Sequence, residues 1–152
     1  MNRRNFLKMV AVSGVAVAAS PVVFSDSHRA YADPKKRSFE DALKEITKGK
    51  TPVESEKVKL IAPSIAENGA VVPVKVEVKD SIENVKAIHI LAEKNFDPWS
   101  VSIHLTPANG KPYFATRIRL AKTMNVYAVA EMSDGSFIMA KKPVKVTIGG
   151  CG

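Results

Sequence analysis

Three observations predict a mainly β fold with one short helix for this chain of 152 residues. Apolar residues repeat at helical spacing only before residue 50, and from residue 51 onward they alternate with polar residues at the period of a strand. Turn signals then recur at intervals of about 8–12 residues. About seven short strands with this spacing and one polar face are typical of an immunoglobulin-like β-sandwich.

The short N-terminal helix is predicted to begin after Ser38 and to end near Gly49. Ser38 is followed three residues later by Asp41, a spacing that resembles a capping box. One apolar stripe at positions i, i+4 and i+7 is formed by Phe39, Leu43 and Ile46. The stripe predicts a single amphipathic helix before the strands begin.

The first strands are predicted from alternating or continuous apolar residues. Val58 and Leu60 alternate with lysines, the valines of residues 72–78 alternate with charged residues, and residues 84–93 form a longer apolar run. Pro73 has no backbone N–H to donate to a sheet ladder. The strand over residues 72–78 is therefore predicted at a sheet edge.

Two hairpins and a final strand are predicted in the second half of the chain. Each hairpin is centred on a dipeptide that favours tight turns, Asn109-Gly110 or Asp134-Gly135. The paired strands are residues 101–105 with 113–120, and residues 125–132 with 137–140. The final strand is expected over residues 144–148, where Val144, Val146 and Ile148 alternate with polar residues.

The first residues of the chain have the order of an export signal. Arg3 and Arg4 precede an apolar segment, residues 9–19, and Ala30-Tyr31-Ala32 supplies an A-x-A cleavage site. Paired arginines indicate the twin-arginine route, and the apolar segment is shorter than the ~20 residues needed to cross a bilayer. We therefore expect residues 1–32 to be a cleaved twin-arginine signal peptide and the mature protein to be periplasmic.

The remainder of the chain is expected to form one domain. It divides into a tail with the short helix (residues 33–50), the sandwich (residues 51–148) and a C-terminal arm (residues 149–152). The whole chain has a formal net charge of +8 at pH 7. Its basic residues are not interleaved with aromatic residues in a stripe that could stack bases, which argues against nucleic-acid binding.

The single cysteine, Cys151, follows the last predicted strand in the sequence Gly149-Gly150-Cys151-Gly152. It cannot form an intrachain disulfide, and a free thiol is unusual in an oxidising compartment, which suggests a chemical use. Gly149, Gly150 and Gly152 are predicted to form a mobile arm because glycine has wide backbone freedom. They offer no side chain that could activate the thiol, so a carrier thiol is favoured over a catalytic nucleophile. An interchain disulfide and an incidental tail cysteine stay open.

No catalytic residue and no metal site are predicted. The chain has no recognisable Ser-His-Asp set, phosphate-binding loop, paired-carboxylate motif or zinc spacing. After the predicted signal, His89 and His104 are the only histidines, and both are interpreted as strand residues rather than metal ligands. Trp99 and Tyr113 stand near the heads of predicted strands and are interpreted as core anchors, with an interface role as the alternative.

These features together resemble the SoxY family, the sulfur carriers of the periplasmic thiosulfate-oxidising Sox system. The resemblance rests on the twin-arginine signal, the short helix, the β-rich body and the ending Val144-Lys145-Val146-Thr147-Ile148-Gly149-Gly150-Cys151-Gly152. The Gly-Gly-Cys-Gly ending is its most specific part. The family usually has two glycines after the cysteine, whereas this chain has only Gly152, which shortens the tip of the arm.

The resemblance implies a carrier that is not itself an enzyme and that has no cofactor. Cys151 maps onto the position that holds thiosulfate-derived sulfur covalently, at the end of a swinging arm. A SoxZ-like subunit would complete a heterodimer or heterotetramer, a SoxXA-type cytochrome c would join thiosulfate to the thiol, and a SoxB-type dimanganese hydrolase would release sulfate. The alternative is an exported immunoglobulin-like structural or adhesive domain with an interchain disulfide through Cys151.

Overall fold

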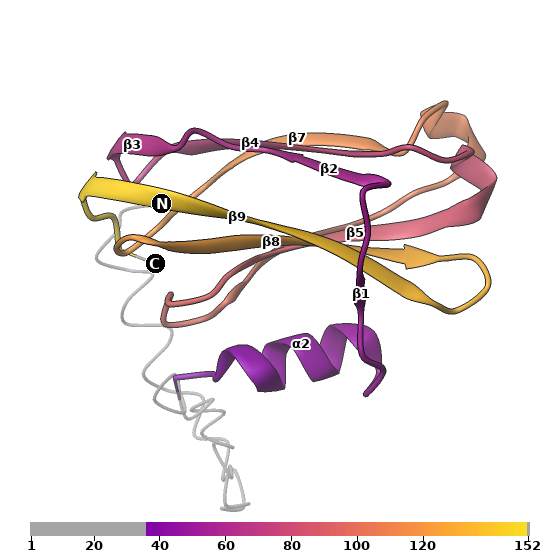
Figure 1. Ribbon diagram of the computed structural model, residues 1–152, viewed down its shortest axis with the longest axis horizontal. Coiled ribbons are helices and arrows are strands. Elements are labelled where there is room, and N and C mark those ends of the chain that lie inside the picture. Colours follow the sequence, from indigo (N-terminus) through magenta and orange to yellow (C-terminus); the bar gives the residue numbers. More distant parts are fainter. Residues whose placement is uncertain (1–35, 152) are drawn as a thin grey trace, which may run out of the picture. The chain divides into compact units, whose positions relative to one another are not determined.

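The computed structural model describes residues 36–151, so the predicted signal peptide and Gly152 lie outside the described residues. In the described part, two β-sheets face each other, and the helix α2 (Phe39–Thr47) lies on the outer side of the larger sheet (Figure 1). This arrangement confirms the predicted β-sandwich with one short helix. A search of the same residues for a helix with the length and hydropathy of a membrane span finds none.

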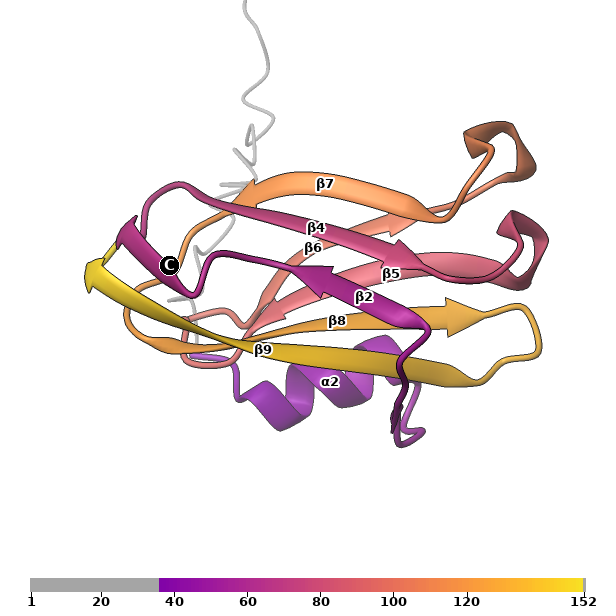
Figure 2. The same cartoon turned by 45° about the horizontal axis from the view of Figure 1, so that its top comes forward.

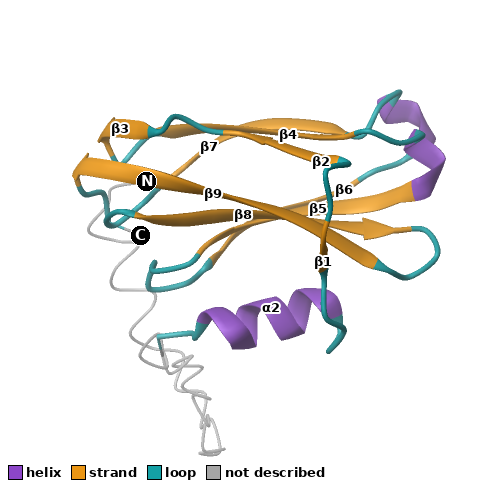
Figure 3. Cartoon of the chain, in the orientation of Figure 1, coloured by secondary structure: helices purple, strands orange, loops and turns teal. Residues whose placement is uncertain are grey.

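The larger sheet has six strands and the smaller sheet has three (Figure 3). The larger sheet has the order β1-β9-β8-β5-β6, with β3 also paired to β9. Its strands are β1 (Val53–Glu54), β3 (Ile65–Asn68), β5 (Val85–Ala92), β6 (Trp99–His104), β8 (Met124–Met132) and β9 (Phe137–Ile148). The smaller sheet has the order β2-β4-β7 and consists of β2 (Val58–Ile61), β4 (Val72–Val78) and β7 (Tyr113–Ile118). Two single 3-10 turns, η1 (Ile82–Asn84) and η2 (Pro107–Asn109), lie in connections.

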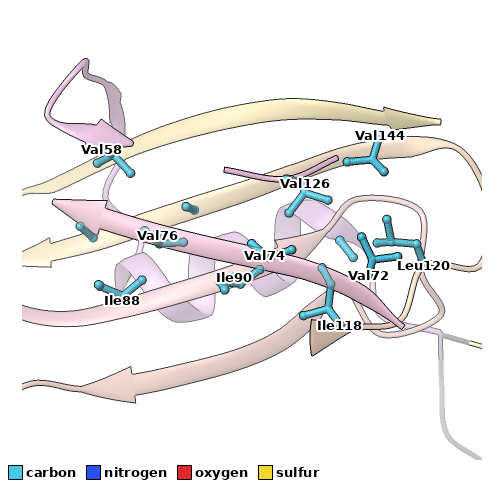
Figure 4. Close-up of a cluster of buried hydrophobic side chains, with 14 of the residues drawn as sticks. Val58, Val72, Val74, Val76, Ile88, Ile90, Ile118, Leu120, Val126 and Val144 are labelled. Carbon is cyan, nitrogen blue, oxygen red and sulfur yellow. The ribbon is translucent and has the colours of Figure 1, made fainter. Parts of the chain in front are cut away.

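The main core lies between the two sheets (Figure 4). Alternate valines of β4 point into it while the residues between them face outward, as the period of a strand requires. Strand β5 has a continuous apolar run because it is covered on both faces, by the smaller sheet on one side and by α2 on the other. The buried residues beneath α2 are Leu91, Val129 and Phe137.

Helix α2 begins and ends as its sequence predicts. The Asp41 backbone N–H donates to the Ser38 hydroxyl oxygen at 3.1 Å, which makes Ser38 the N-cap. Lys48 adopts the left-handed conformation, with a φ of 55°, and ends the helix. Ala42 and Ile46 are buried against the larger sheet, so these two side chains attach the helix to the sandwich.

The predicted hairpin across Asn109-Gly110 is wrong. Strand β6 pairs with β5 in the larger sheet, whereas β7 pairs with β4 in the smaller sheet. The 3-10 turn η2 and the residues around it carry the chain from one sheet to the other, and Gly110 takes a positive φ of 76° there. The dipeptide therefore marks a turn, but the partner of each strand is decided by other strands. The hairpin across Asp134-Gly135, between β8 and β9, is confirmed.

The predicted edge position of the strand containing Pro73 is also wrong, because β4 is the central strand of the smaller sheet. Its pairing with β2 extends only from Lys75 to Val78. Pro73 lies beyond that segment, where β7 is the paired neighbour. A proline is tolerated there because the strand has a free side at that position.

The segments predicted as separate strands over residues 137–140 and 144–148 form one continuous strand, β9. Pro143 lies within it, opposite Asn125 of β8. On its other edge, β9 pairs with β1 at residues 138–139 and with β3 at residues 145–148. Pro143 therefore falls in the gap between these two short parallel pairings, where a missing N–H leaves no ladder bond unmade.

Candidate functional site

Cys151 is exposed and free, and it lies three residues beyond the end of β9. The last pair of β9 is formed by Ile148 and Asn68 of β3, so the cysteine leaves the sandwich at the end where β3 turns into β4 (Figure 2). Among residues 36–151, no side chain forms a hydrogen bond with the Cys151 sulfur. The thiol is therefore presented to solvent and not held in a pocket of its own chain.

The two glycines before Cys151 lie against backbone of two other connections. A Cβ atom added to Gly149 would collide with the Ala121 carbonyl oxygen, and one added to Gly150 would lie 2.7 Å from the Ala70 Cα. Real Cβ atoms essentially never come closer than 3.0 Å to such neighbours. The sequence suggested glycine here for mobility. The structure gives it a second reason, which is that no side chain fits.

Hydrogen bonds tie these three segments together. The Gly150 N–H donates to the Leu120 carbonyl oxygen at 2.9 Å, and the Leu120 N–H donates to the Gly69 carbonyl oxygen at 2.7 Å. The Gly69 N–H in turn donates to the Ile148 carbonyl oxygen at 2.7 Å. We call Gly69, Ala70, Leu120 and Ala121 the arm base, because they surround the segment that leads to Cys151.

The arm base is connected to the core by Leu120. Its side chain is fully buried between the sheets, near Val72 at the start of β4 (Figure 4). Gly69 also has no room for a side chain, since a Cβ there would meet the Leu120 carbonyl oxygen and lie 2.8 Å from the Gly150 nitrogen. The backbone of the arm base is thus close-packed and continuous with the interior.

A buried asparagine holds the connection that contains Leu120. Asn95 is only 5% exposed, and its side-chain NH₂ donates to the Arg119 carbonyl oxygen at 2.8 Å. Its side-chain oxygen accepts the Ala121 N–H at 3.0 Å. Asn95 and the arm base could not be predicted from the sequence, because a loop asparagine and a lone Gly-Ala pair carry no signal of what they contact in the fold.

Basic and apolar side chains are exposed around the arm base. Arg119 and Lys122 flank the Leu120–Ala121 pair, and Lys145 lies on the last part of β9. Val71 and Ile148 are 54% and 68% exposed. The end of the sandwich that carries Cys151 therefore combines three basic side chains, one exposed carboxylate, Glu67 of β3, and exposed apolar surface.

The two predicted strand histidines lie in different surroundings. His104 is exposed at the end of β6, whereas His89 is buried on β5 and only 5% exposed. His89 Nδ1 is 2.6 Å from the Ser102 hydroxyl, and burial lowers the pKa of His89 to about 4. Residues 36–151 contain no group of three His, Cys, Asp or Glu side chains that could hold a metal ion.

The two predicted aromatic anchors, Trp99 and Tyr113, also lie in different surroundings. Trp99 packs against the residues beneath α2, and its indole N–H donates to the Ser102 hydroxyl at 2.6 Å. Tyr113 is 38% exposed and stacks with the Lys111 ammonium 5.0 Å from its ring centroid. Of the predicted site residues within the described part of the chain, Gly149, Gly150 and Cys151 lie at this end of the sandwich, and Gly152 is outside that part.

Comparison with known proteins identifies the family. The model of the family described as sulfur oxidation protein SoxY matches residues 43–151, which includes Cys151 and both preceding glycines. The structure of the sulfur carrier protein SoxY from Chlorobium limicola f thiosulfatophilum is 39% identical, with a TM-score of 0.60, over 72% of this chain and 96% of that chain. None of the curated proteins compared with the chain matches it.

A second group of solved structures shares only the fold. The superoxide reductase (neelaredoxin) from Ignicoccus hospitalis is 21% identical, with a TM-score of 0.52, over 72% of this chain and 93% of that chain. Such a likeness shows the same sandwich and carries no activity with it. The family match over residues 43–151, together with the SoxY structure of the same architecture, shows that this chain belongs to the SoxY family.

Proposed function

We propose that this protein is a sulfur carrier that holds sulfur covalently on Cys151 and presents it to partner enzymes. The observation that carries the proposal is the free, exposed thiol of Cys151, inside the segment that matches the SoxY family. The 39% identical relative is itself a sulfur carrier protein. A thiol that must enter several active sites in turn needs exposure and small neighbours. Cys151 is exposed, and the two residues before it are glycines.

We infer that the sulfur comes from thiosulfate. Loading joins the cysteine sulfur to the terminal sulfur of thiosulfate, so that one S–S bond forms, the thiol proton is released and two electrons leave. A SoxXA-type cytochrome c would accept those electrons, and a SoxB-type dimanganese hydrolase would then split off the sulfonate as sulfate by hydrolysis. The chemistry belongs to the partners, which makes the protein a substrate of enzymes and not an enzyme.

The surroundings of the arm base fit anionic intermediates. A cysteine that carries a sulfonate gains a negative charge, and Arg119, Lys122 and Lys145 lie exposed at the same end of the sandwich.

We infer that the mature protein works in the periplasm after twin-arginine export and pairs with a SoxZ-like subunit. Exposed Val71 and Ile148 supply apolar area near the thiol for contact with a partner.

Replacement of the thiol tests the carrier function directly. Protein isolated from cells grown on thiosulfate should carry reducible sulfur adducts on the peptide with Cys151, as measured by mass spectrometry before and after treatment with a reductant. Cys151→Ser should abolish both the adducts and thiosulfate oxidation. The matched control adds Ser81→Cys to Cys151→Ser, which restores one thiol at an exposed position whose side chain makes no cap bond.

The control should remain inactive, because a thiol away from the arm cannot enter a partner's active site. Thiosulfate oxidation by Cys151→Ser would contradict the proposal. A fully occupied disulfide-linked homodimer on non-reducing gels, with no sulfur adduct on Cys151, would favour the structural or adhesive alternative. Partial dimer after exposure to air is expected of any accessible thiol and decides nothing.

A further inference from the structure

We propose that the outer face of the smaller sheet is a docking surface for an acidic region of the enzyme that loads Cys151. The inference rests on the proposed function in taking Cys151 to be loaded by a separate enzyme. Four observations carry it, namely the exposure, the charge and the shape of this face, and its position beside the connections that border the arm.

The outer face of the smaller sheet is open. In the described part of the chain no helix or strand lies over it, whereas α2 covers the larger sheet (Figure 1). Side chains alternate along each strand, so every second residue faces outward. We call these outward residues the basic face, and they are Lys59 and Ile61 of β2, Pro73, Lys75 and Glu77 of β4, and Tyr113, Ala115 and Arg117 of β7.

The basic face has more positive charge than its own carboxylate can offset. Glu77 lies directly opposite Lys59 in the register of β2 and β4. Lys75 lies opposite Ala115, which makes Arg117 its diagonal neighbour across β4 and β7. Within residues 36–151, neither Lys75 nor Arg117 forms an ion pair. Two neighbouring cations without a counter-charge repel each other, which indicates a use outside the chain.

The charge around the basic face extends the same pattern. Exposed Lys111 and Arg119 flank β7 at its two ends. The loop carboxylate Asp97 borders the Arg117 end and is 3.8 Å from Arg37, in an ion pair of its own.

Helix α2 differs from the basic face, because its exposed carboxylates outnumber its lysine. They are Glu40, Asp41 and Glu45, against Lys44. An approaching acidic protein is therefore attracted to the basic face and not to the helix, which orients the encounter.

The shape of the basic face suits a carboxylate. Pro73 and Ala115 are short side chains between Lys75 and Arg117, and a shallow depression lies there. Its lining is completed by Val74 and Thr116. A carboxylate of a partner that entered this depression would have a cation on either side. Arginine can hold such a group through two parallel hydrogen bonds.

The basic face ends beside the arm. The pair Pro73–Arg117 is next to the last pair of β4 and β7, after which the two chains continue into the arm base. There the Leu120 carbonyl oxygen accepts from the Gly150 N–H. Residues 149–152, when extended, reach roughly 13 Å. An enzyme that rests on the basic face can therefore receive the thiol while the docking contact is kept.

The rate of loading at different salt concentrations tests the inference. The probe is the cytochrome c of the proposed function, with thiosulfate as the second substrate. The second-order rate constant for loading wild-type protein should fall as sodium chloride is raised, because salt screens charges beyond about 8 Å at 0.15 M. The double variant Lys75→Glu with Arg117→Glu should be loaded at least roughly tenfold more slowly at low salt, and should lose that salt dependence.

The matched control is Lys44→Glu with Lys141→Glu. It changes the net charge by the same amount at exposed positions of α2 and of β9, where Lys141 lies opposite Tyr127, a residue packed beneath α2. Loading of the control should stay within about twofold of wild type. Lys75→Gln with Arg117→Gln is a milder pair that keeps the sheet free of new carboxylates, and it should have an intermediate rate. Equal slowing of the two charge-reversed proteins, or loading of wild type that ignores salt, overturns the inference.

Two further outcomes would assign the basic face to another occupant and would also overturn the inference. One is release of the paired subunit by Lys75→Glu with Arg117→Glu, as measured by size-exclusion chromatography with mass determination. The other is binding of the wild-type protein to phosphatidylglycerol vesicles that the same double variant abolishes, as measured by co-sedimentation.

Failure of the carrier proposal would be distinguishable. Normal adducts on Cys151 with loading that ignores salt would leave the carrier and refute the docking surface. If wild-type Cys151 carried no adduct, an NMR titration with a hexaglutamate peptide at low salt would still test the basic face. Shifts of the Lys75 and Arg117 amide signals, with the Lys44 and Lys141 signals unmoved, would support an acidic protein as its partner. Unmoved Lys75 and Arg117 signals would refute it.

Discussion

At the scale of single residues, His89 is a buried histidine whose ring is only partly hydrogen-bonded within the described part of the chain. Its ring is buried on the side of β5 that faces α2, with Nδ1 2.6 Å from the Ser102 hydroxyl. The Nε2 atom has no hydrogen-bond partner among the described residues. Burial holds the pKa of His89 near 4, opposed by Glu131 and assisted by His104 and Lys48. The ring is therefore neutral in the folded protein at neutral pH.

This predicts an acid-sensitive contribution to stability. Because the folded pKa of His89 is about 4 and the ordinary value is 6.5, the unfolded chain binds more protons between these values. The free energy of unfolding should therefore fall as the pH drops from about 6.5 to about 4. His89→Gln should lack this part of the pH dependence, and His104→Gln, which alters an exposed ring, should retain it. Urea unfolding at a series of pH values measures both slopes, and equal slopes for wild type and His89→Gln would refute the account.

The same scale shows why Gly149 and Gly150 are needed. A sequence pattern identifies glycine but does not identify what lies beside it, and mobility and close approach both favour the same residue. The backbone of Ala121 next to Gly149, and of Ala70 next to Gly150, shows that close approach operates here. Their replacement therefore changes the packing of the arm base as well as the stiffness of the arm.

At the scale of elements, α2 and β9 show what holds the sandwich together. Helix α2 adds a third layer, and it covers the face of β5 and β8 that the smaller sheet leaves open. Strand β9 pairs with three strands along its length, namely β8, β1 and β3. Its last pairing, with β3, brings Ile148 to Gly69 and so delivers the chain to the arm base.

Removal of apolar contact beneath α2 tests the role of that layer. Ile46 is 4% exposed in the cluster between the helix and the larger sheet. Ile46→Ala should lower the free energy of unfolding by about 2–5 kcal/mol, because the transfer of the lost atoms and the cavity both count. Lys44→Ala, at an exposed position on the same helix, should change it by no more than about 0.5 kcal/mol. Chemical denaturation measures both, and a similar small change in the two variants would show that the helix contributes little.

At the scale of the whole molecule, the thiol and the covered faces lie in separate places. Cys151 leaves from one end of the sandwich, whereas α2 covers a face of the larger sheet. The end that carries Cys151 is formed by the connections on which the arm base lies. A partner enzyme can therefore approach the thiol without displacing the helix or opening the core.

Export is predicted for the whole protein and depends on residues outside the described part of the chain. Arg3→Lys combined with Arg4→Lys should leave the protein in the cytoplasm with residues 1–32 still attached, because the route requires the arginine pair. Cell fractionation and the mass of the purified protein measure this. Arg29→Lys removes an arginine from the same predicted signal but outside the pair, and should be exported normally. Periplasmic, shortened protein from the double variant would contradict the twin-arginine route.

The sequence by itself determined much of the architecture and the candidate residue. The change in period at residue 51, the cap at Ser38 and the turn at Asp134-Gly135 each depend on local backbone preference, so they could be predicted. Cys151 could be singled out for a similar reason, because composition and neighbours are visible along the chain. The hairpin across Asn109-Gly110 could not be judged in this way, since the strands that β6 and β7 join are far away in the sequence.

Only the tertiary structure decided the partners of each strand, the burial of His89 and the contacts of the arm. Asn95, Gly69 and Leu120 come from three separate connections, and no local pattern relates them to residue 150. They meet because β3, β4, β7, β8 and β9 are packed so that these connections lie at one end of the sandwich. The physical reason is that backbone preference acts over a few residues, whereas close packing joins any segments that the sheets bring together.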